Sequence, residues 1–352
     1  MAGGINETIN MWMRSRRINI PAHVVLTVLS IVYGLAVLAR NFFYRISLFK
    51  SEKLPCRVIS IGNLTTGGTG KTPVAIAVAG FLRKKGIKAV VVSRGYKRTT
   101  SGILSVSDGK SVFLTPEEAG DEPYVMAKRL KGVPVVVGED RVAGGRYAIR
   151  AFKPEIIILD DAFQHLRIKR DLDIALVDGK DGFGNGFLIP RGILREPASG
   201  IKRADAIFIK GGTRDDYLAK KLKTIAAPCF VFNLVPTGLT DISGNKDMGL
   251  EYLKGKKIFA FAGLANPDSF FVAIENLGGK LKGALRFPDH HWFTQKDMEE
   301  IKKQGSGVEL IVTTEKDAVR IKQGHGMDIY ALCVDAVPED KDAFKKILEQ
   351  VI

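Results

Sequence analysis

Cysteine is scarce in this sequence, and no tract of it is repetitive or of low complexity. Its three cysteines, Cys56, Cys229 and Cys333, stand far apart with no C-x-x-C spacing. Neither a disulfide framework nor a zinc site is therefore indicated, and a reducing, cytosolic setting fits. The 352 residues are 45% apolar, which is ample for the core of one large α/β unit or of two domains.

Acidic residues are scarce near the start of the chain. Residues 1–60 contain eight Lys or Arg against two acids, so they carry +6 of the net charge of +15. Such a bias suits an anionic membrane surface or nucleic acid. A solubilising basic face would have the same composition, so composition alone leaves the partner open.

Charged residues are absent between Arg17 and Arg40, and these 22 positions would make a helix of roughly 33 Å, long enough to span a bilayer. Basic residues flank both ends. A spanning helix would place one basic cluster on the outer side, whereas a helix in the interface places both among lipid headgroups. We therefore expect an interfacial anchor, with a span or a buried core helix as alternatives. Small and polar residues follow one stripe of this helix: His23, Thr27, Ser30, Gly34, Asn41 and Arg45.

A glycine-rich segment follows, where residues 58–72 read VISIGNLTTGGTGKT. The pattern predicts a buried strand, a loop whose backbone N–H groups turn inward, and the start of a helix. A lysine at the end of such a loop reaches the β- and γ-phosphates of a nucleotide, and the next hydroxyl reaches Mg²⁺. One position departs from G-x-x-x-x-G-K-[ST], because Thr65 replaces the first glycine. A chance glycine loop is the alternative. The predicted phosphate site comprises Thr65, Thr66, Gly67, Gly68, Thr69, Gly70, Lys71 and Thr72.

Short apolar runs alternate with helical patterns along the rest of the chain. A helical pattern over residues 73–85 leads to a second strand at 89–92, which completes a βαβ unit. Strands buried on both faces and alternating with helices predict an α/β fold with a parallel sheet covered on both sides. We expect an anchoring segment at 1–50, a P-loop domain at 51–235 and a smaller α/β domain at 236–352, divided where residues 236–255 are polar and turn-rich.

Two acids and two polar residues follow one apolar run. Asp160 and Asp161 come directly after the apolar residues 156–159. In NTPases an acid in this place after a strand holds Mg²⁺ directly or through water. Which of the two contacts the metal stays open, and a solvated turn is the alternative. Gln164 and His165 follow closely enough to meet the same phosphates, although His165 fits equally well as a loop histidine bonded to backbone.

Residues 93–98 follow the second strand at the carboxyl edge of the sheet, where α/β proteins bind ligands. Their three cations suit an anionic substrate group or form an ordinary basic loop. Residues 117–123 are the acidic counterpart. Because Pro123 marks a helix start, Asp121 or Glu122 has helix capping as its simplest role.

Histidines are few, and three of the five are His165, His290 and His291. A neutral imidazole can accept a hydroxyl proton if a carboxylate orients it. A loop histidine beside the helix cap Thr294 is the alternative. In residues 313–317, TTEKD, lysine and aspartate are adjacent, so the N/T-K-x-D spacing of a guanine-reading loop fails and GTP is disfavoured.

Taken in order, these segments resemble the tetraacyldisaccharide 4′-kinase family, the lipid A kinases of Gram-negative bacteria. The resemblance covers roughly residues 20–335, and Ala162 departs from it where the family usually has glycine. It rests on the basic-flanked helix, residues 65–72, 93–98 and 117–123, Glu139-Asp140-Arg141, residues 160–165, Leu194-Arg195-Glu196-Pro197, and residues 287–290 and 313–317.

The resemblance implies a P-loop domain plus a smaller C-terminal α/β part, with the active site in the cleft and the N-terminal helix on the cytoplasmic face of the inner membrane. The reaction would move the γ-phosphoryl of ATP to the 4′-hydroxyl of a tetraacylated glucosamine disaccharide 1-phosphate, giving lipid IVA. Asp121 and His290 would activate that hydroxyl, and Lys71 would stabilise charge on the transferred group. Mg²⁺ ligands would come from Thr72, Asp160, Asp161 and Glu196, and phosphate or substrate contacts from Asn63, Arg94, Arg141, Gln164, His165 and Arg195.

Two other functions compete with this one. A membrane-associated P-loop ATPase switch would phosphorylate nothing, but proteins of that kind carry a lysine just ahead of the paired glycines, where this chain has Thr66. A nucleic-acid-dependent NTPase draws support from the charge alone and predicts steeply salt-dependent binding. We therefore expect a lipid substrate, an anionic membrane surface, no nucleic acid and a monomer.

Overall fold

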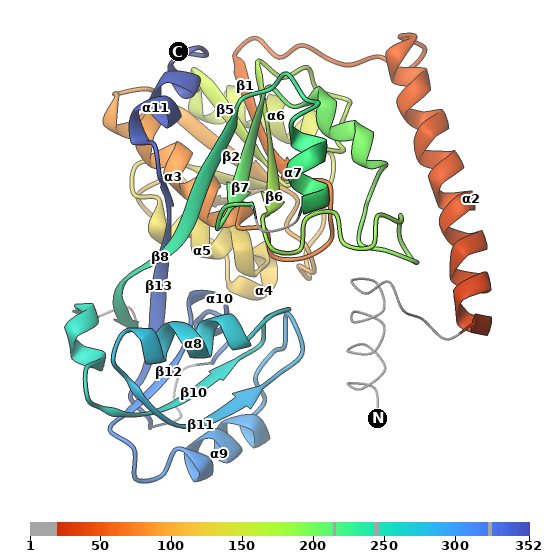
Figure 1. The fold of residues 1–352 in the computed structure, drawn as a ribbon. Coiled ribbons are helices and arrows are strands. Elements are labelled where there is room, and N and C mark those ends of the chain that lie inside the picture. Colours follow the sequence, from red (N-terminus) through yellow and green to blue (C-terminus); the bar gives the residue numbers. More distant parts are fainter. Residues whose placement is uncertain (1–19, 214–215, 243–245, 323–325) are drawn as a thin grey trace.

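The computed structural model describes residues 20–352 except 214–215, 243–245 and 323–325. One mostly parallel sheet runs through the molecule (Figure 1), and among the strands of the described residues the pairs β13–β8, β3–β4 and β8–β9 are antiparallel. In spatial order the strands are β11 (Lys280–Arg286), β10 (Lys257–Ala262), β12 (Leu310–Thr314), β13 (Ile329–Pro338), β8 (Cys229–Asp241), β7 (Ala206–Lys210), β6 (Leu172–Asp178), β1 (Arg57–Asn63), β5 (Ile156–Asp160), β2 (Ala89–Ser93), β4 (Val135–Val137) and β3 (Leu104–Ser107), with β9 (Asp247–Met248) beside β8.

Helices cover both faces of the central strands, as the apolar runs predicted. On one face, Ile59 and Ile158 pack with α3 (Lys71–Lys84), α5 (Asp121–Arg129) and α11 (Lys341–Glu349). On the other face, Val58 and Ile157 pack with α6 (Arg141–Phe152). Because neighbouring residues of a strand point to opposite faces, a continuous apolar run is what such a doubly covered strand requires. The expectation of a covered parallel sheet is confirmed.

A smaller lobe, residues 242–328, lies below the main body in Figure 1, and the strands β8 and β13 connect the two. It contains β10, β11 and β12 with α8 (Asp268–Asn276), α9 (Gln295–Gln304) and α10 (Glu315–Ala318). The two connecting strands pair from Tyr330 with Asp241 to Pro338 with Phe232. Residues 236–241, expected to be turn-rich, therefore continue β8, because a long partner strand supplies their hydrogen bonds. After β13 the chain returns to the main body as α11.

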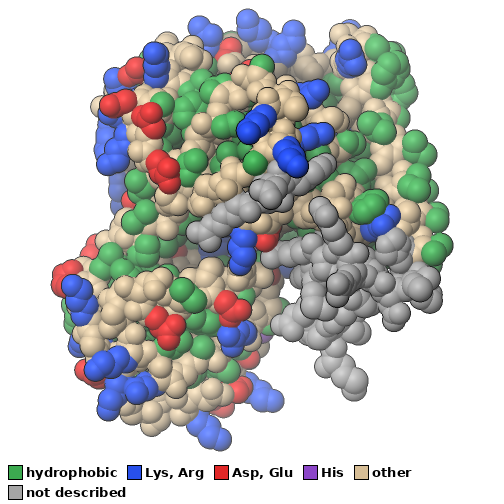
Figure 2. All heavy atoms as spheres, viewed as in Figure 1, with side chains coloured by type: hydrophobic (Ala, Val, Ile, Leu, Met, Phe, Trp, Pro, Cys, Tyr) green, Lys and Arg blue, Asp and Glu red, His purple; other side chains and the backbone are tan. Residues whose placement is uncertain are grey.

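The N-terminal helix, α2 (Ile20–Arg45), lies against the main body by one stripe. Ser30 Oγ donates a hydrogen bond to the Leu188 carbonyl at 2.9 Å, and Asn41 Nδ2 donates one to Glu196 Oε2 at 3.2 Å. This stripe matches the predicted line of small and polar residues, although the side chain of His23 lies outside the described residues. The outer face is apolar and exposed (Figure 2), so the buried-core alternative is wrong. Residues Val24–Arg45 are long and apolar enough to cross a membrane.

Candidate active site

The predicted phosphate loop joins β1 to α3. Gly67 and Gly70 have φ of 113° and 89°, in the left-handed region that favours glycine. A Cβ at Gly70 would also lie 3.2 Å from the Phe232 ring. Thr65, by contrast, does not have a positive φ, which explains why the pattern's first glycine is dispensable here. Gly70 is the N-cap of α3, so the free N–H groups of the first helical turn point towards the loop and form an anion site.

Neighbouring segments hold this loop in shape. The Thr66 N–H donates to the Ile193 carbonyl at 2.7 Å, and Asn63 Nδ2 donates to Thr69 Oγ1 at 3.0 Å. Lys71 is buried, with its Nζ 3.5 Å from Asn63 Oδ1 and 3.9 Å from Asp161 Oδ1. The lysine thus lies between the loop and the acids that end β5, as phosphate binding requires.

The two acids at the end of β5 differ in their surroundings. Asp160 Oδ2 accepts a hydrogen bond from Ser93 Oγ at 2.8 Å, whereas its buried Oδ1 has no partner among the described residues. Burial, reinforced by Glu122 and Asp161, raises the pKa of Asp160 to about 7. Such a carboxylate favours binding a cation over remaining alone.

Asp161, in contrast, is already paired with cations. Its Oδ1 accepts from Arg195 Nη1 at 2.7 Å. Burial alone would raise the pKa of Asp161, but the charges of Lys71 and Arg195 outweigh that effect and lower it. A free carboxylate oxygen on Asp160 and the hydroxyl of Thr72, the second residue of α3, are donors that Mg²⁺ prefers. The residues present therefore fit the metal, and Asp160 fits better than Asp161.

The expected aspartate–histidine pair forms across 169 residues of sequence. His290 Nδ1 lies 2.8 Å from Asp121 Oδ2, and Arg320 donates to the same oxygen through Nε at 3.1 Å and through Nη2. Burial would raise the pKa of Asp121, but the His290 hydrogen bond and the Arg320 charge outweigh it and hold the pKa well below its ordinary value. Asp121 is therefore ionised. Because an ionised carboxylate can only accept, His290 Nδ1 donates this hydrogen bond, and Nε2 is the ring nitrogen that Asp121 does not engage.

Helix capping does not explain these acids. The N-cap of α5 is Gly120, with no side-chain cap, and Asp121 Oδ1 accepts from the adjacent Glu122 N–H at 2.9 Å. The charge of Glu122 acts on Asp160, and that of Lys71 acts on Glu122. Glu122, the neighbour of Asp121, is therefore close enough to the phosphate loop and the acids of β5 for their charges to interact.

Buried and half-buried cations surround the same edge of the sheet. Arg141, the first residue of α6, is buried, and burial together with the nearby charge of Arg94 lowers its pKa. Burial and the charges of Arg141 and Arg170 lower the pKa of His165 to about 4, so His165 is neutral near pH 7. The buried Nε2 of His165 has no partner among the described residues. These groups suit phosphate or hydroxyl contacts.

Two residues of the expected set are committed to the protein itself. Glu196 is fully buried and bonds Arg203 through both oxygens, at 2.7 and 2.9 Å, while Gln164 Nε2 donates to it at 2.9 Å. Gln164 also donates to the Asn63 carbonyl at 2.9 Å. Since both carboxylate oxygens of Glu196 already accept hydrogen bonds, Glu196 is left out of the metal site that we propose below. It links α2 to the phosphate loop instead.

Arg320 is the site residue that the sequence did not suggest. It lies three residues after Asp317, and Arg320 Nη1 donates to Asp317 Oδ1 at 3.1 Å. Spacing of this kind is common on helices and carries no functional signal by itself. Its contact with Asp121, 199 residues away, appears only in three dimensions.

A glycine-rich phosphate loop, a buried acid with a free oxygen and an adjacent Asp–His pair define a P-loop phosphotransferase. The family model described as tetraacyldisaccharide-1-P 4′-kinase (LpxK) matches residues 22–352. The chain belongs to this family, which confirms the resemblance noted in the sequence.

Relatives agree over almost the whole chain. The tetraacyldisaccharide 4′-kinase of Desulfatibacillum aliphaticivorans is 43% identical over 339 residues, covering 92% of this chain and 91% of the relative. That of Syntrophus aciditrophicus is 40% identical over 317 residues, covering 86% and 85%. Among solved structures, LpxK from Aquifex aeolicus in complex with ATP is 34% identical, with a TM-score of 0.78, and covers 94% of this chain and 99% of that one.

Proposed function

We propose that this protein transfers the γ-phosphoryl group of ATP to the 4′-hydroxyl of tetraacyldisaccharide 1-phosphate, forming lipid IVA. The observation that carries the proposal is the Asp121–His290 pair, 2.8 Å between Oδ2 and Nδ1, in a molecule that also forms a phosphate loop at the start of α3. Family membership supports the substrate, and the pair supports transfer to a hydroxyl rather than simple nucleotide binding.

The proton of the acceptor hydroxyl goes to His290. With Nδ1 donating to Asp121, Nε2 can accept this proton as the acceptor oxygen bonds to the γ-phosphorus and the bond to the β-phosphate oxygen breaks, releasing ADP. Asp121 stays ionised and stabilises the imidazolium that forms. General base help of this kind contributes typically 10²–10⁴-fold, and positioning supplies much of the rest.

The phosphate loop and the acids of β5 hold the nucleotide. Lys71 is placed to neutralise charge on the transferred group, and backbone N–H groups at the start of α3 bind the phosphates. Thr72 and Asp160 would hold Mg²⁺, which when bound shields phosphate charge. We assign Arg94, Arg141, His165 and Arg195 to phosphate or headgroup contacts because they surround the same edge.

The two lobes supply different parts of the site. The main body supplies the nucleotide site and Asp121, while the smaller lobe supplies His290 and Arg320. The acceptor therefore binds in the cleft between them. We retain the predicted division near residue 235 in this functional sense, with α11 belonging to the main body.

We further propose that α2 lies in the interface of the cytoplasmic face of the inner membrane. Its docked stripe from Ser30 to Asn41 keeps that length of helix at the level of the main body, which a spanning helix could not do. The exposed apolar face would enter the lipid, and basic residues at its ends would meet anionic headgroups. Acyl chains of the substrate can then stay in the bilayer during the reaction.

The deciding experiment is incubation with labelled ATP and tetraacyldisaccharide 1-phosphate. Wild type should produce a labelled lipid, and Lys71→Ala should abolish transfer while retaining the wild-type circular dichroism spectrum. Wild-type turnover in Lys71→Ala would refute the phosphate-loop assignment. ATP hydrolysis by wild type with no labelled lipid would favour the ATPase switch instead.

A further inference from the structure

Arg320 connects the two lobes at the Asp–His pair. Its side chain is 1% exposed and donates to Asp121 Oδ2 of the main body through Nε and Nη2. On its other side, Nη1 donates to Asp317 Oδ1 at 3.1 Å and to the Gly263 carbonyl at 3.4 Å. The guanidinium is thus fixed by the smaller lobe and directs one edge at Asp121.

Asp317 is itself held in place. Its Oδ2 accepts from Thr314 Oγ1 at 2.7 Å and from the Gly263 N–H at 3.1 Å. Because each partner of the guanidinium is anchored, rotation of Arg320 would break several buried hydrogen bonds at once, each costly to leave unmade. Arg320 is therefore held rigidly, as positioning requires.

The buried Asp121 carboxylate needs a full positive charge, which the guanidinium of Arg320 always carries and the imidazole of His290 carries only when protonated. Lys316, whose charge also acts on Asp121, is paired with Glu122. Arg320 is therefore the direct ionic partner of Asp121. An unpaired buried carboxylate would tend to take up a proton, and a protonated Asp121 could no longer orient His290 through an ionic hydrogen bond.

We propose that Arg320 is a positioning residue for phosphoryl transfer, acting through Asp121 to hold His290 Nε2 towards the acceptor hydroxyl. The proposal rests on the proposed function. It also explains why the smaller lobe must be docked for the reaction, since His290 and Arg320 reach Asp121 from the same lobe.

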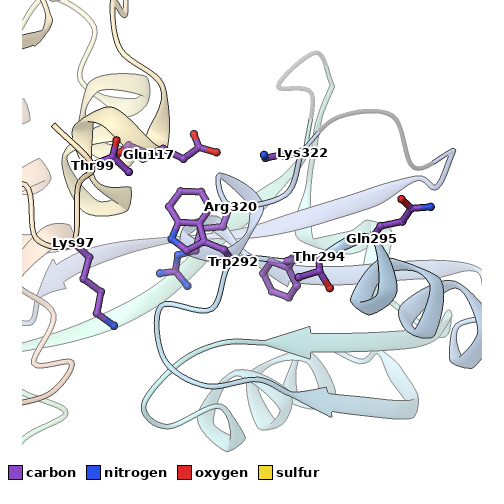
Figure 3. Close-up of a pocket in the computed structure, with 9 residues that line it drawn as sticks. Lys97, Thr99, Glu117, Trp292, Thr294, Gln295, Arg320 and Lys322 are labelled. Carbon is purple, nitrogen blue, oxygen red and sulfur yellow. The ribbon is translucent and has the colours of Figure 1, made fainter.

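A cavity beside Arg320 makes a direct test possible. Arg320 lines a cavity of about 450 Å³ together with Lys97 and Glu117 of the main body and Trp292 of the smaller lobe (Figure 3). Truncation of Arg320 would open its own space into this cavity. A guanidinium ion from solution could then occupy the place of the lost group, since the carboxylates of Asp121 and Asp317 would remain.

The experiment compares lipid phosphorylation by wild type, Arg320→Ala, Arg320→Lys and a control, Arg129→Ala. Arg129 also joins the lobes, through Glu315 and Asp335, but does not contact Asp121. We expect Arg320→Ala to lower kcat about 10–100-fold, part of the 10²–10⁴-fold of a general base, with KM for ATP within about twofold. Arg320→Lys should fall between. Guanidinium chloride at about 20 mM should raise kcat several-fold in Arg320→Ala and in no other variant. Sodium chloride at the same concentration should leave kcat unchanged.

The outcomes separate the possible roles. Loss of kcat with rescue by guanidinium supports positioning, and so does an Asp121→Ala/Arg320→Ala variant no slower than Asp121→Ala. A folded Arg320→Ala with wild-type kcat overturns the proposal, as does a loss that Arg129→Ala reproduces equally. If neither Arg320→Ala nor Arg320→Lys folds, Arg320 is a folding residue and the proposal fails. A wild type that phosphorylates no lipid would instead refute the proposed function itself.

Discussion

Two adjacent histidines, His290 and His291, have different roles. His291 Nε2 lies 2.9 Å from Asp297 Oδ2, beside the cap Thr294, whereas His290 Nδ1 bonds Asp121. His291 thus takes the place expected of a loop histidine beside the cap, whereas the contact of His290 fits proton transfer, which stays a prediction. The sequence could offer candidates by residue type, but not which imidazole meets which carboxylate, because that depends on packing between lobes. Arg320 could not be predicted for the same reason, because its contact with Asp121 also depends on the packing between the lobes.

Removal of either member of the pair should slow the chemical step. Asp121→Ala and His290→Ala should each lower kcat by about 10²–10⁴-fold, the usual contribution of general base catalysis, because His290 loses either its orientation or its place as proton acceptor. The double variant should be about as slow as the slower single one. Steady-state lipid phosphorylation measures this. Losses that multiply in the double variant would show two independent groups instead.

Asp160 should make the nucleotide-free protein less stable at alkaline pH. Its pKa in the folded state is raised to about 7 by burial, Glu122 and Asp161. Between the unfolded value near 4 and this value the folded state holds the extra proton, so stability from this group is present at low pH and lost as pH rises through 7. Asp160→Asn removes the charge while keeping the shape.

Without nucleotide or Mg²⁺, Asp160→Asn should raise Tm at pH 8 by roughly 2–4 °C, corresponding to about 1 kcal/mol. The difference should shrink as the pH falls and vanish only near pH 4, where the unfolded state also takes up the proton. Lipid phosphorylation by the variant should be lost, because the neutral amide cannot replace a charged metal ligand. Differential scanning calorimetry at both pH values gives the comparison, and a lower Tm for Asp160→Asn at pH 8 would contradict it.

At the scale of elements, central strands and long helices were predictable, whereas edges were not. The helical pattern predicted over residues 73–85 is α3, which spans Lys71–Lys84. In contrast, β3 and β11 were not predicted. Both lie at the sheet edges: LSVS is only four residues long with two of them buried, and KLKGALR is half-buried or exposed throughout. Such strands lack the continuous apolar run that identifies a covered strand.

The outer face of α2 should govern membrane binding. Val32 and Leu35 are 61% and 62% exposed, on the face away from the docked stripe. The double variant Val32→Glu/Leu35→Glu should weaken binding to anionic vesicles at least about tenfold, since burying each side chain contributes about 1.5–3 kcal/mol and the new charges face anionic lipid. Vesicle flotation measures this. Val272→Glu, at another exposed apolar position, in α8 (51%), should bind like wild type. Wild-type binding by the double variant would place the anchor elsewhere.

At the scale of the whole molecule, the order of the lobes in space departs from their order in the chain. After the smaller lobe, α11 packs on the helix that carries the phosphate loop, with the Phe344 and Phe81 ring centroids 6.4 Å apart. This last helix could not be assigned to a lobe in advance, because its amphipathic pattern shows that one face is buried but not which element covers that face. The division of the chain near residue 235 therefore agrees with which lobe supplies which site residues, but not with where the last helix packs.

This return makes the C-terminus part of the nucleotide-binding core. Leu348 is fully buried in the same cluster as Val74 and Val78 of α3. Leu348→Ala should cost about 2–5 kcal/mol of stability through lost contacts and a cavity, and Tm should fall by several degrees. Ile352→Ala, at a position 50% exposed, is the matched control and should melt like wild type. Because α3 begins with Lys71 and Thr72, ATP with Mg²⁺ should recover part of the lost Tm in Leu348→Ala by binding the folded state. If Leu348→Ala is as stable as the control, α11 does not contribute to the stability of the core around α3.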